Sequence, residues 1–216
     1  MMGRIGKNLV LLSFFCLFMV LSRCIKTQQF SFVFLFWNLF LAFVPYWIST
    51  YLVAQKELKL WKLAGLSMLW LLFLPNAPYM LTDLFHLHKR AHLPVWFDLV
   101  LILSFAVTGL YLFYVSVHQM TRLAQIRFPQ LNKPVFLLLL FLAVSYGVYI
   151  GRFLRVNSWD VLNPLELAKT CLKPLFHFHH LKDACSFTLI FTGLLLCQFF
   201  ILSPKANKSK RFDYFK

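Results

Sequence analysis

The chain has 216 residues, of which 60% are hydrophobic, 19% are aromatic and only 13% are charged, and its mean hydropathy is +0.70. A water-soluble domain of this length needs far more polar surface, so the composition excludes an ordinary soluble fold and indicates an integral membrane protein. The net charge of +15 indicates cations at a membrane surface. Membrane lipids are the expected partners, and no nucleic acid is expected because no folded basic module is recognisable.

Six apolar segments follow one another along the chain and predict about six transmembrane helices. A span needs roughly 20 mostly apolar residues, and the segments are residues 8–22, 30–54, 63–81, 94–118, 134–153 and 184–203. No internal repeat or linker divides the chain. The prediction is an all-α membrane helical bundle, one transmembrane domain over residues 1–216 with a short basic cytoplasmic tail at 204–216.

The first segment is the shortest, and it can span only if Arg4, Lys7 and Arg23 reach toward the lipid headgroups. A cleaved signal peptide is the alternative, because two cations precede an apolar run of suitable length. No small-x-small cleavage pattern follows that run, so we prefer an uncleaved helix.

Two prolines interrupt the third segment near its end, at Pro75 and Pro78. Each removes a backbone donor, so the helix is expected to unwind there. Freed backbone groups at membrane depth are tolerated only against protein or a water-filled cavity, so the break marks one edge of a candidate site that includes Asn76 and Tyr79. A simple helix end followed by proline is the alternative.

Acidic and histidine side chains follow the break. Asp83 and His86 share a helical face, and with His88 they offer oxygen and nitrogen ligands for a divalent metal whose remaining ligands would come from elsewhere. Asp98, near the start of the fourth segment, must be paired, metal-bound or protonated. The candidate catalytic residues are Asp83, His86 and Asp98. The alternative for Asp98 is a structural ion pair with Arg152 or Arg155.

The fifth segment ends in two arginines, Arg152 and Arg155, whose spacing predicts one shared helical face that could grip a phosphate or carboxylate. The small residues Gly147 and Gly151 would let another helix approach closely. Ordinary anchoring of the helix end at the membrane interface is the alternative for the arginines.

A connection of residues 155–183 separates the last two segments. Asn163 is a candidate N-cap there, followed by a proline and by Glu166 in the first turn, and the pattern predicts an amphipathic helix lying at the interface. The termini and the connections on their side of the membrane carry 13 Lys and Arg, and the connections on the opposite side carry 9, which predicts that both termini are cytoplasmic.

Topology brings the polar groups together. The end of the third segment, the start of the fourth and the end of the fifth must meet at one membrane face, which the charge bias makes the extracytoplasmic one. We therefore expect a pocket at that rim, with Asp83, His86, His88 and Asp98 joined by ligand-binding residues; these are Asn38, Asn76, Tyr79, Arg152, Arg155, Asn157 and Asp160.

The same blocks resemble a family of bacterial multi-pass membrane proteins, domain of unknown function thirteen-sixty-one. The resemblance runs from about Phe30 to the sixth segment and rests on residues 38–46, 75–79, 82–84, 96–98 and 146–160. It implies a bacterial cytoplasmic membrane and supplies no activity.

Two classes of function stay open. The first is a non-enzymatic membrane protein whose polar pocket binds an anionic or lipid-headgroup ligand. The second is a membrane-embedded, metal-dependent hydrolase or transferase that acts on lipid-linked or cell-envelope substrates. No motif of known catalytic specificity decides between them.

Overall fold

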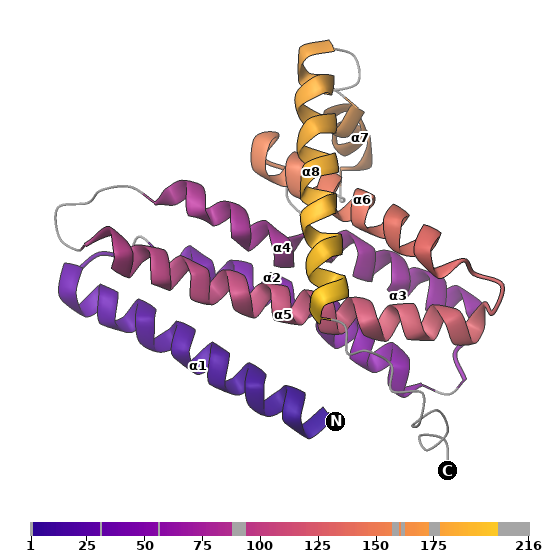
Figure 1. Cartoon of the computed structure of the whole chain (residues 1–216), viewed down its shortest axis with the longest axis horizontal. Coiled ribbons are helices and arrows are strands. Elements are labelled where there is room, and N and C mark those ends of the chain that lie inside the picture. The colour runs from indigo at the N-terminus through magenta and orange to yellow at the C-terminus, as the bar shows by residue number, and fades with distance from the viewer. Residues whose placement is uncertain are drawn as a thin grey trace.

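The protein is described by a computed structural model that covers residues 2–30, 32–55, 57–87, 94–156, 160, 163–172 and 178–202, with the side chains of 2–5, 86, 164, 171 and 178–180 left out. All regular elements in these ranges are helical (Figure 1). They are α1 (Met2–Thr27), α2 (Phe34–Ala54), α3 (Leu60–Phe73), α4 (Asn76–Tyr79), the 3-10 helix η1 (Met80–His86), α5 (Val95–Arg127), α6 (Lys133–Phe153), α7 (Pro164–Leu172) and α8 (Phe178–Leu202).

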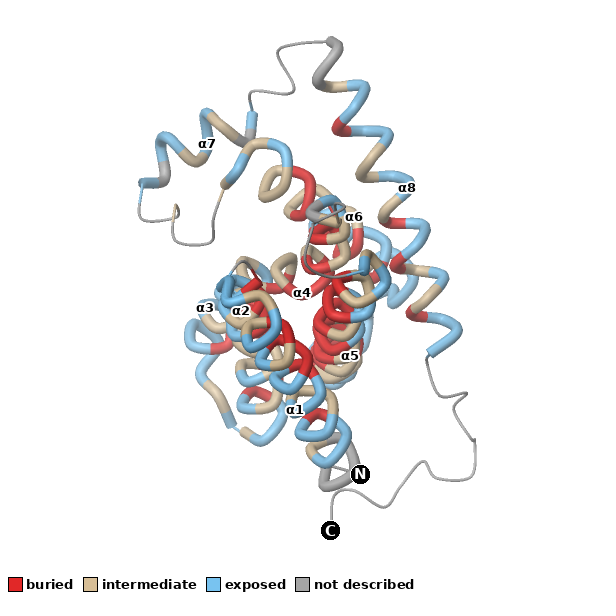
Figure 2. Tube along the Cα trace, turned by 90° about the vertical axis from the view of Figure 1, so that its left-hand side faces the viewer, coloured by how far each residue is buried: buried red, intermediate tan, exposed pale blue. Residues whose placement is uncertain are grey.

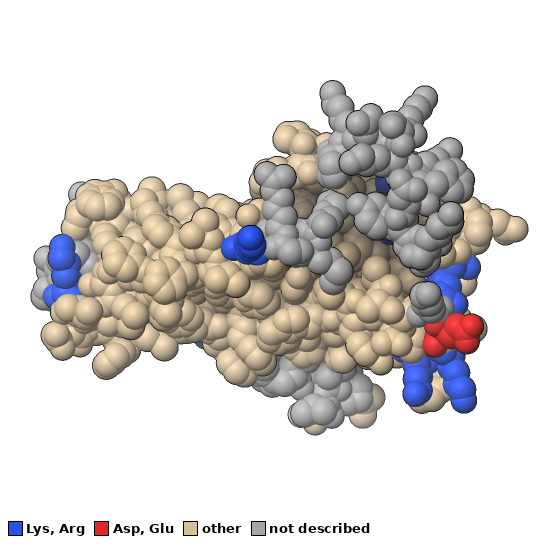
Figure 3. All heavy atoms as spheres, turned by 90° about the horizontal axis from the view of Figure 1, so that it is seen from below, with Lys and Arg blue, Asp and Glu red and all other residues tan. Residues whose placement is uncertain are grey.

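Six helical stretches are long and apolar enough to cross a membrane, which confirms the predicted membrane bundle. The α3–α4–η1 stretch counts as one of them, Leu60–Phe85. The first span is longer than the sequence suggested, Gly6–Thr27, and the fourth continues to Arg127. On the face shown in Figure 3, Lys and Arg lie at both ends of the long axis and Asp and Glu at one end, and the wide surface between them is largely uncharged apart from one basic group. The predicted tail at 204–216 lies outside the described residues.

Helix α5 forms the centre of the bundle. Its buried side chains include Leu101, Phe105, Leu112 and Phe113, and it packs against α1, α2, α4 and η1. Figure 2 shows the buried positions concentrated along α5 and the faces turned toward it. Helix α6 instead pairs with α8, where Thr192 donates a hydrogen bond to the Ser145 hydroxyl at 2.9 Å.

Polar side chains inside the apolar bundle satisfy one another. The Trp70 indole N–H donates to the Ser116 hydroxyl at 2.7 Å, and Ser116 in turn donates to the carbonyl of Pro45 at 3.0 Å. Ser49 donates to the Gln119 side-chain oxygen at 2.7 Å. Because an unpaired polar group in an apolar surrounding costs free energy, this network ties α2, α3 and α5 to one another.

The predicted break in the third span is present. Helix α3 ends at Phe73, α4 is a single turn, and the chain then tightens into η1. The Asn76 side-chain amide donates to the Phe73 carbonyl at 2.9 Å, so it satisfies the end of α3 rather than the start of α4. A carbonyl group left open where α3 ends therefore finds a partner within the protein.

The broken segment fits because glycines face it on both sides. A Cβ atom on Gly109 of α5 would lie 2.8 Å from the Met80 sulfur and 2.9 Å from the Ala77 carbonyl oxygen. On α6, a Cβ atom on Gly147 would lie 2.6 Å from Cγ of Pro75. Only glycine allows α5 and α6 to approach the break this closely.

The predicted helix between the fifth and sixth spans is also present, as α7, and Glu166 and Lys169 form an exposed pair on it at 2.8 Å. Its position at the membrane interface stays a prediction, and so does the single-domain organisation.

Replacing Gly147 by valine is expected to destabilise the protein by about 1–3 kcal/mol, because the added carbons overlap Pro75. Gly193→Val is the matched control, since a Cβ atom at Gly193 in α8 meets nothing within 4 Å. Thermal unfolding in detergent measures both variants. Equal melting temperatures for the two would show that the α6 contact with the break is not tight.

Candidate functional site

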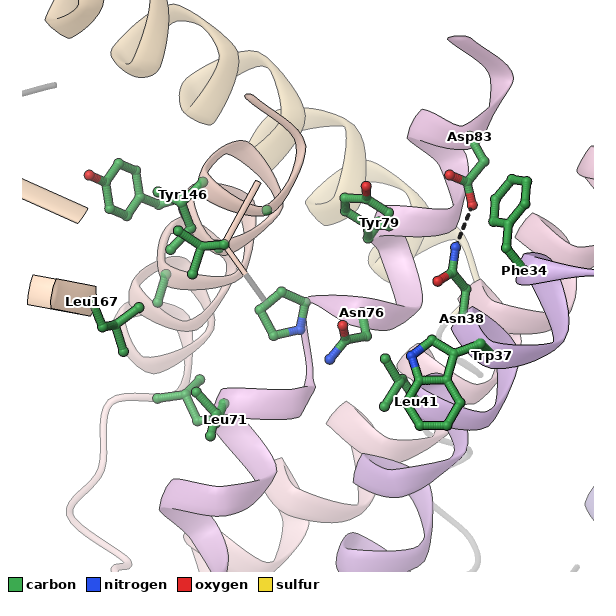
Figure 4. Close-up of a pocket in the computed structure, with 17 residues that line it drawn as sticks. Phe34, Trp37, Asn38, Leu41, Leu71, Asn76, Tyr79, Asp83, Tyr146 and Leu167 are labelled. Carbon is green, nitrogen blue, oxygen red and sulfur yellow. Dashed lines mark hydrogen bonds between the residues drawn. The ribbon is translucent and has the colours of Figure 1, made fainter. Parts of the chain in front are cut away.

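A cavity of about 500 Å³ lies where α2, the broken third span and α6 meet, and this volume is in the range of small-ligand sites. Figure 4 shows its walls converging from α2, from α3 to η1 and from α6, with Leu167 of α7 also contributing. The lining residues are Phe34, Trp37, Asn38, Leu41, Leu71, Leu72, Pro75, Asn76, Tyr79, Asp83, Ala143, Tyr146, Gly147, Ile150, Gly151, Val156 and Leu167.

The deep part of the cavity is apolar. Its walls are Leu41, Leu71, Leu72 and Ala143. Ala143 precedes the last residue of α6, Phe153, by ten residues, which is about 15 Å along the helix axis. Since the hydrocarbon core of a bilayer is about 30 Å thick, the cavity reaches from the rim toward the middle of the span.

The part of the cavity nearer the rim is polar. The Asn38 side-chain amide donates to a carboxylate oxygen of Asp83 at 3.0 Å, across the gap between α2 and η1 (Figure 4). Asn76 and Tyr79, from the turn of α4, line the same space. Four of the residues predicted from the sequence therefore line one cavity. They meet there because the chain turns at the break and the first turns of α2 face that turn.

Asp83 is buried, with 1% of its surface exposed. Its other carboxylate oxygen lies 3.6 Å from the Arg152 guanidinium, which also donates to the Tyr79 hydroxyl at 3.5 Å. The guanidinium lies over the Phe85 ring at 5.1 Å. Arg152 does not line the cavity itself, but contacts two residues that do. The positive charge of Arg152 therefore offsets the negative charge of Asp83 from outside the cavity.

Asp98 has a different environment from the one expected. Its carboxylate accepts a hydrogen bond from Nε of Arg23 at 2.8 Å, and both side chains are almost fully buried. The predicted pairing with Arg152 or Arg155 is wrong, because the end of α1 reaches the start of α5 and supplies Arg23 instead. The Phe32 ring covers the guanidinium at 4.3 Å. Asp98 is absent from the described lining of the cavity.

Arg155 also differs from expectation. Helix α6 ends at Phe153, and Arg155 has a left-handed φ of 56°, so Arg152 and Arg155 do not share a helical face. The Val156 N–H donates back to the Ile150 carbonyl at 3.3 Å, so the chain folds back over the end of the helix, with Arg155 in the left-handed conformation that glycine usually supplies at helix ends. Arg155 and Asp160 line a second, shallower hollow of about 260 Å³.

The metal hypothesis stays a prediction. His88 and Asn157 lie outside the described residues, as does the side chain of His86. Within the described ranges no group of three or more His, Cys, Asp or Glu side chains is close enough to hold a metal ion.

Sequence reasoning missed the apolar walls and the partner of Asp98. One signal was available: Ala143, Gly147 and Gly151 recur every fourth residue on α6, and such a stripe of small residues leaves room beside a helix. Arg23 was interpreted only as a snorkelling cation, because spacing alone does not reveal which helix end meets which.

A family model described as "Protein of unknown function (DUF1361)" matches residues 37–197. The chain belongs to this family. The match spans every cavity-lining residue except Phe34, whereas Arg23 and the rest of α1 precede it. No curated protein and no solved structure matches the chain.

Breaking the Arg23–Asp98 pair is expected to be costly. Arg23→Leu leaves a buried carboxylate without its partner, which should destabilise the protein by about 3–5 kcal/mol. The double variant with Asp98→Leu should regain much of that loss, because no lone buried charge remains. Melting temperatures of the two single variants and the double variant test this; purely additive losses would contradict a coupled pair.

Proposed function

We propose that the protein binds a membrane lipid, with the headgroup at the polar part of the cavity and the hydrocarbon chain in its apolar part. The observation that carries this proposal is the division of one cavity into two chemistries. Asn38, Asn76, Tyr79 and Asp83 offer hydrogen bonds near the rim, and leucine and alanine side chains form the deep walls. An amphiphile matches both parts at once, whereas a small polar solute matches only the first.

The charges around the cavity favour a headgroup that carries hydroxyl groups. The only charged side chain among the described lining residues is Asp83, a carboxylate. Arg152 balances it from behind at 3.6 Å. An added anion would meet the carboxylate first, while a hydroxyl group can donate to it and accept from the asparagine amides. The proposal therefore prefers a hydroxyl-bearing headgroup over an anionic group alone.

We also propose a bacterial cytoplasmic membrane as the location, as the family resemblance implies, with both termini cytoplasmic. The support for the orientation is the distribution of Lys and Arg over the connections. In this orientation the polar part of the cavity faces the outer side of the membrane, where it would meet lipids of the outer leaflet.

An enzyme is the second candidate, and one feature favours it. Asp83 is a buried carboxylate that is held by Asn38 and Arg152 and borders a cavity, which is an arrangement suited to acid–base chemistry on a bound lipid-linked substrate. A hydrolase or transferase would convert the lipid, whereas a binding protein would return it intact. Analysis of the lipid after incubation, with and without divalent metal, separates the two.

Photolabelling tests the proposed recognition of the headgroup. Three lipids with the same diazirine-bearing chains are compared in vesicles: phosphatidylglycerol, phosphatidic acid and phosphatidylcholine. Labelling is expected to be strongest with phosphatidylglycerol. Asn38→Leu should lower it by about fivefold, since a hydrogen bond of ordinary strength is removed.

Asn8→Leu is the matched control, because Asn8 is exposed on α1 and does not line the cavity. Equal labelling by all three lipids would contradict headgroup recognition. Phosphatidic acid labelling as strongly as phosphatidylglycerol would replace the hydroxyl preference with recognition of the phosphate.

Reporter fusions test the orientation. A fusion after residue 90 is expected to be active only as an extracytoplasmic reporter, and one after residue 208 only as a cytoplasmic reporter, because positive charge retains a connection on the cytoplasmic side. A cytoplasmic reporter that is active at residue 90 would reverse the topology.

A further inference from the structure

We infer that the cavity opens sideways into the bilayer between α3 and α6, and that the lipid's chain enters through this opening. The inference rests on the proposed function and adds the route by which the ligand arrives. It excludes a ligand that reaches the site only from the aqueous side of the membrane.

The opening follows from where α3 and α6 touch and where they do not. At the break the two are in contact, since only 2.6 Å would separate a Cβ atom on Gly147 from Pro75. Four residues earlier on each helix, Leu71 and Ala143 both border the cavity. The helices therefore diverge below the break, and the space between them is the deep part of the cavity.

The walls of this deep part also belong to the outer surface. Leu71 is 39% exposed and Ala143 is exposed as well, while both line the cavity. Side chains that border a cavity and also face the surroundings mark an opening. Ala143 lies about 15 Å from the end of α6, a depth at which a membrane offers hydrocarbon chains rather than water.

Among the described helices outside the cavity walls of α2, α3 to η1 and α6, α7 reaches the cavity with Leu167. Helix α8 packs on another face of α6, through contacts of Thr192 with Ser145 and of Phe187 with Tyr149. Helix α3 is the least buried of the six spans. The polar groups of Asn38 and Asp83 continue the cavity toward the rim, which fixes the direction of the occupant: chain below the break and headgroup above it.

Crosslink mapping tests the sideways opening. The probe is phosphatidylglycerol with a diazirine at the middle of one chain, incorporated into phosphatidylcholine vesicles with the full-length protein. Crosslinks are expected at residues 71–72 and 143–147. Ala143→Trp should reduce them about tenfold, because excluding about two methylene groups from apolar contact is enough for that factor.

Ala64→Trp is the matched control, since Ala64 is exposed on α3 and does not line the cavity; it should leave the crosslinks unchanged. Leu72→Trp, on the opposite wall, repeats the test if Ala143→Trp fails to fold. Crosslinks spread evenly over the lipid-facing helices, or unaffected by both wall variants, would overturn the inference.

The two proposals fail in different ways. Dihexanoyl phosphatidylglycerol is soluble in water. If it reduces crosslinking by the probe as much as the long-chain lipid does, the sideways route is wrong while headgroup recognition stands. If phosphatidylglycerol and phosphatidylcholine probes crosslink equally at residues 71–72 and 143–147, a chain site exists and the proposed headgroup recognition is wrong.

Discussion

The interruption of the third span at Pro75 and Pro78 is the constraint on which the other features depend. Hydrocarbon offers no partner for backbone groups, so a broken helix persists in a membrane only where protein replaces the lost bonds. Here Asn76 satisfies the end of α3, and two glycines let α5 and α6 close around the turn. Below this tight contact α3 and α6 diverge, and the cavity lies directly beside the break.

Buried charges at this end of the bundle are also satisfied within the protein. In the part of the chain that the structure describes, two ion pairs lie buried or nearly so at this end: Arg23 with Asp98, and Arg152 with Asp83. The first contact is short and remote from the cavity, so it stabilises the packing of α1 against α5. The second is longer and adjoins the cavity, where a carboxylate that is balanced but not tightly held can still take part in recognition.

Much of the architecture could be predicted from the sequence, because lipid imposes length and hydropathy on every span and proline imposes the break. Asn38, Asn76, Tyr79 and Asp83 could be assigned to one rim for the same reason. Pairing between helix ends could not, since topology places many side chains at the rim without saying which ones touch. Arg155 shows a second limit: hydropathy placed the end of the fifth segment at residue 153, but the left-handed conformation of Arg155, at a position where glycine is usual, has no signal in the sequence.

The hydrogen-bonded network around Pro45 has a mechanical consequence. Because Trp70, Ser116 and Pro45 are linked in series, α2, α3 and α5 behave as one stiff body, and sliding any of them would strand polar groups in hydrocarbon. Helix α6 is joined to that body at the break and through the contact of Phe113 with Phe141. Helix α8 packs on α6 and is also tied to α5, because the Tyr114 hydroxyl donates to the Gln198 side-chain oxygen at 2.7 Å. The cavity therefore has one wall, formed by α2 and α3, that belongs to the stiff body, and a second wall, α6, that is joined to it through fewer contacts.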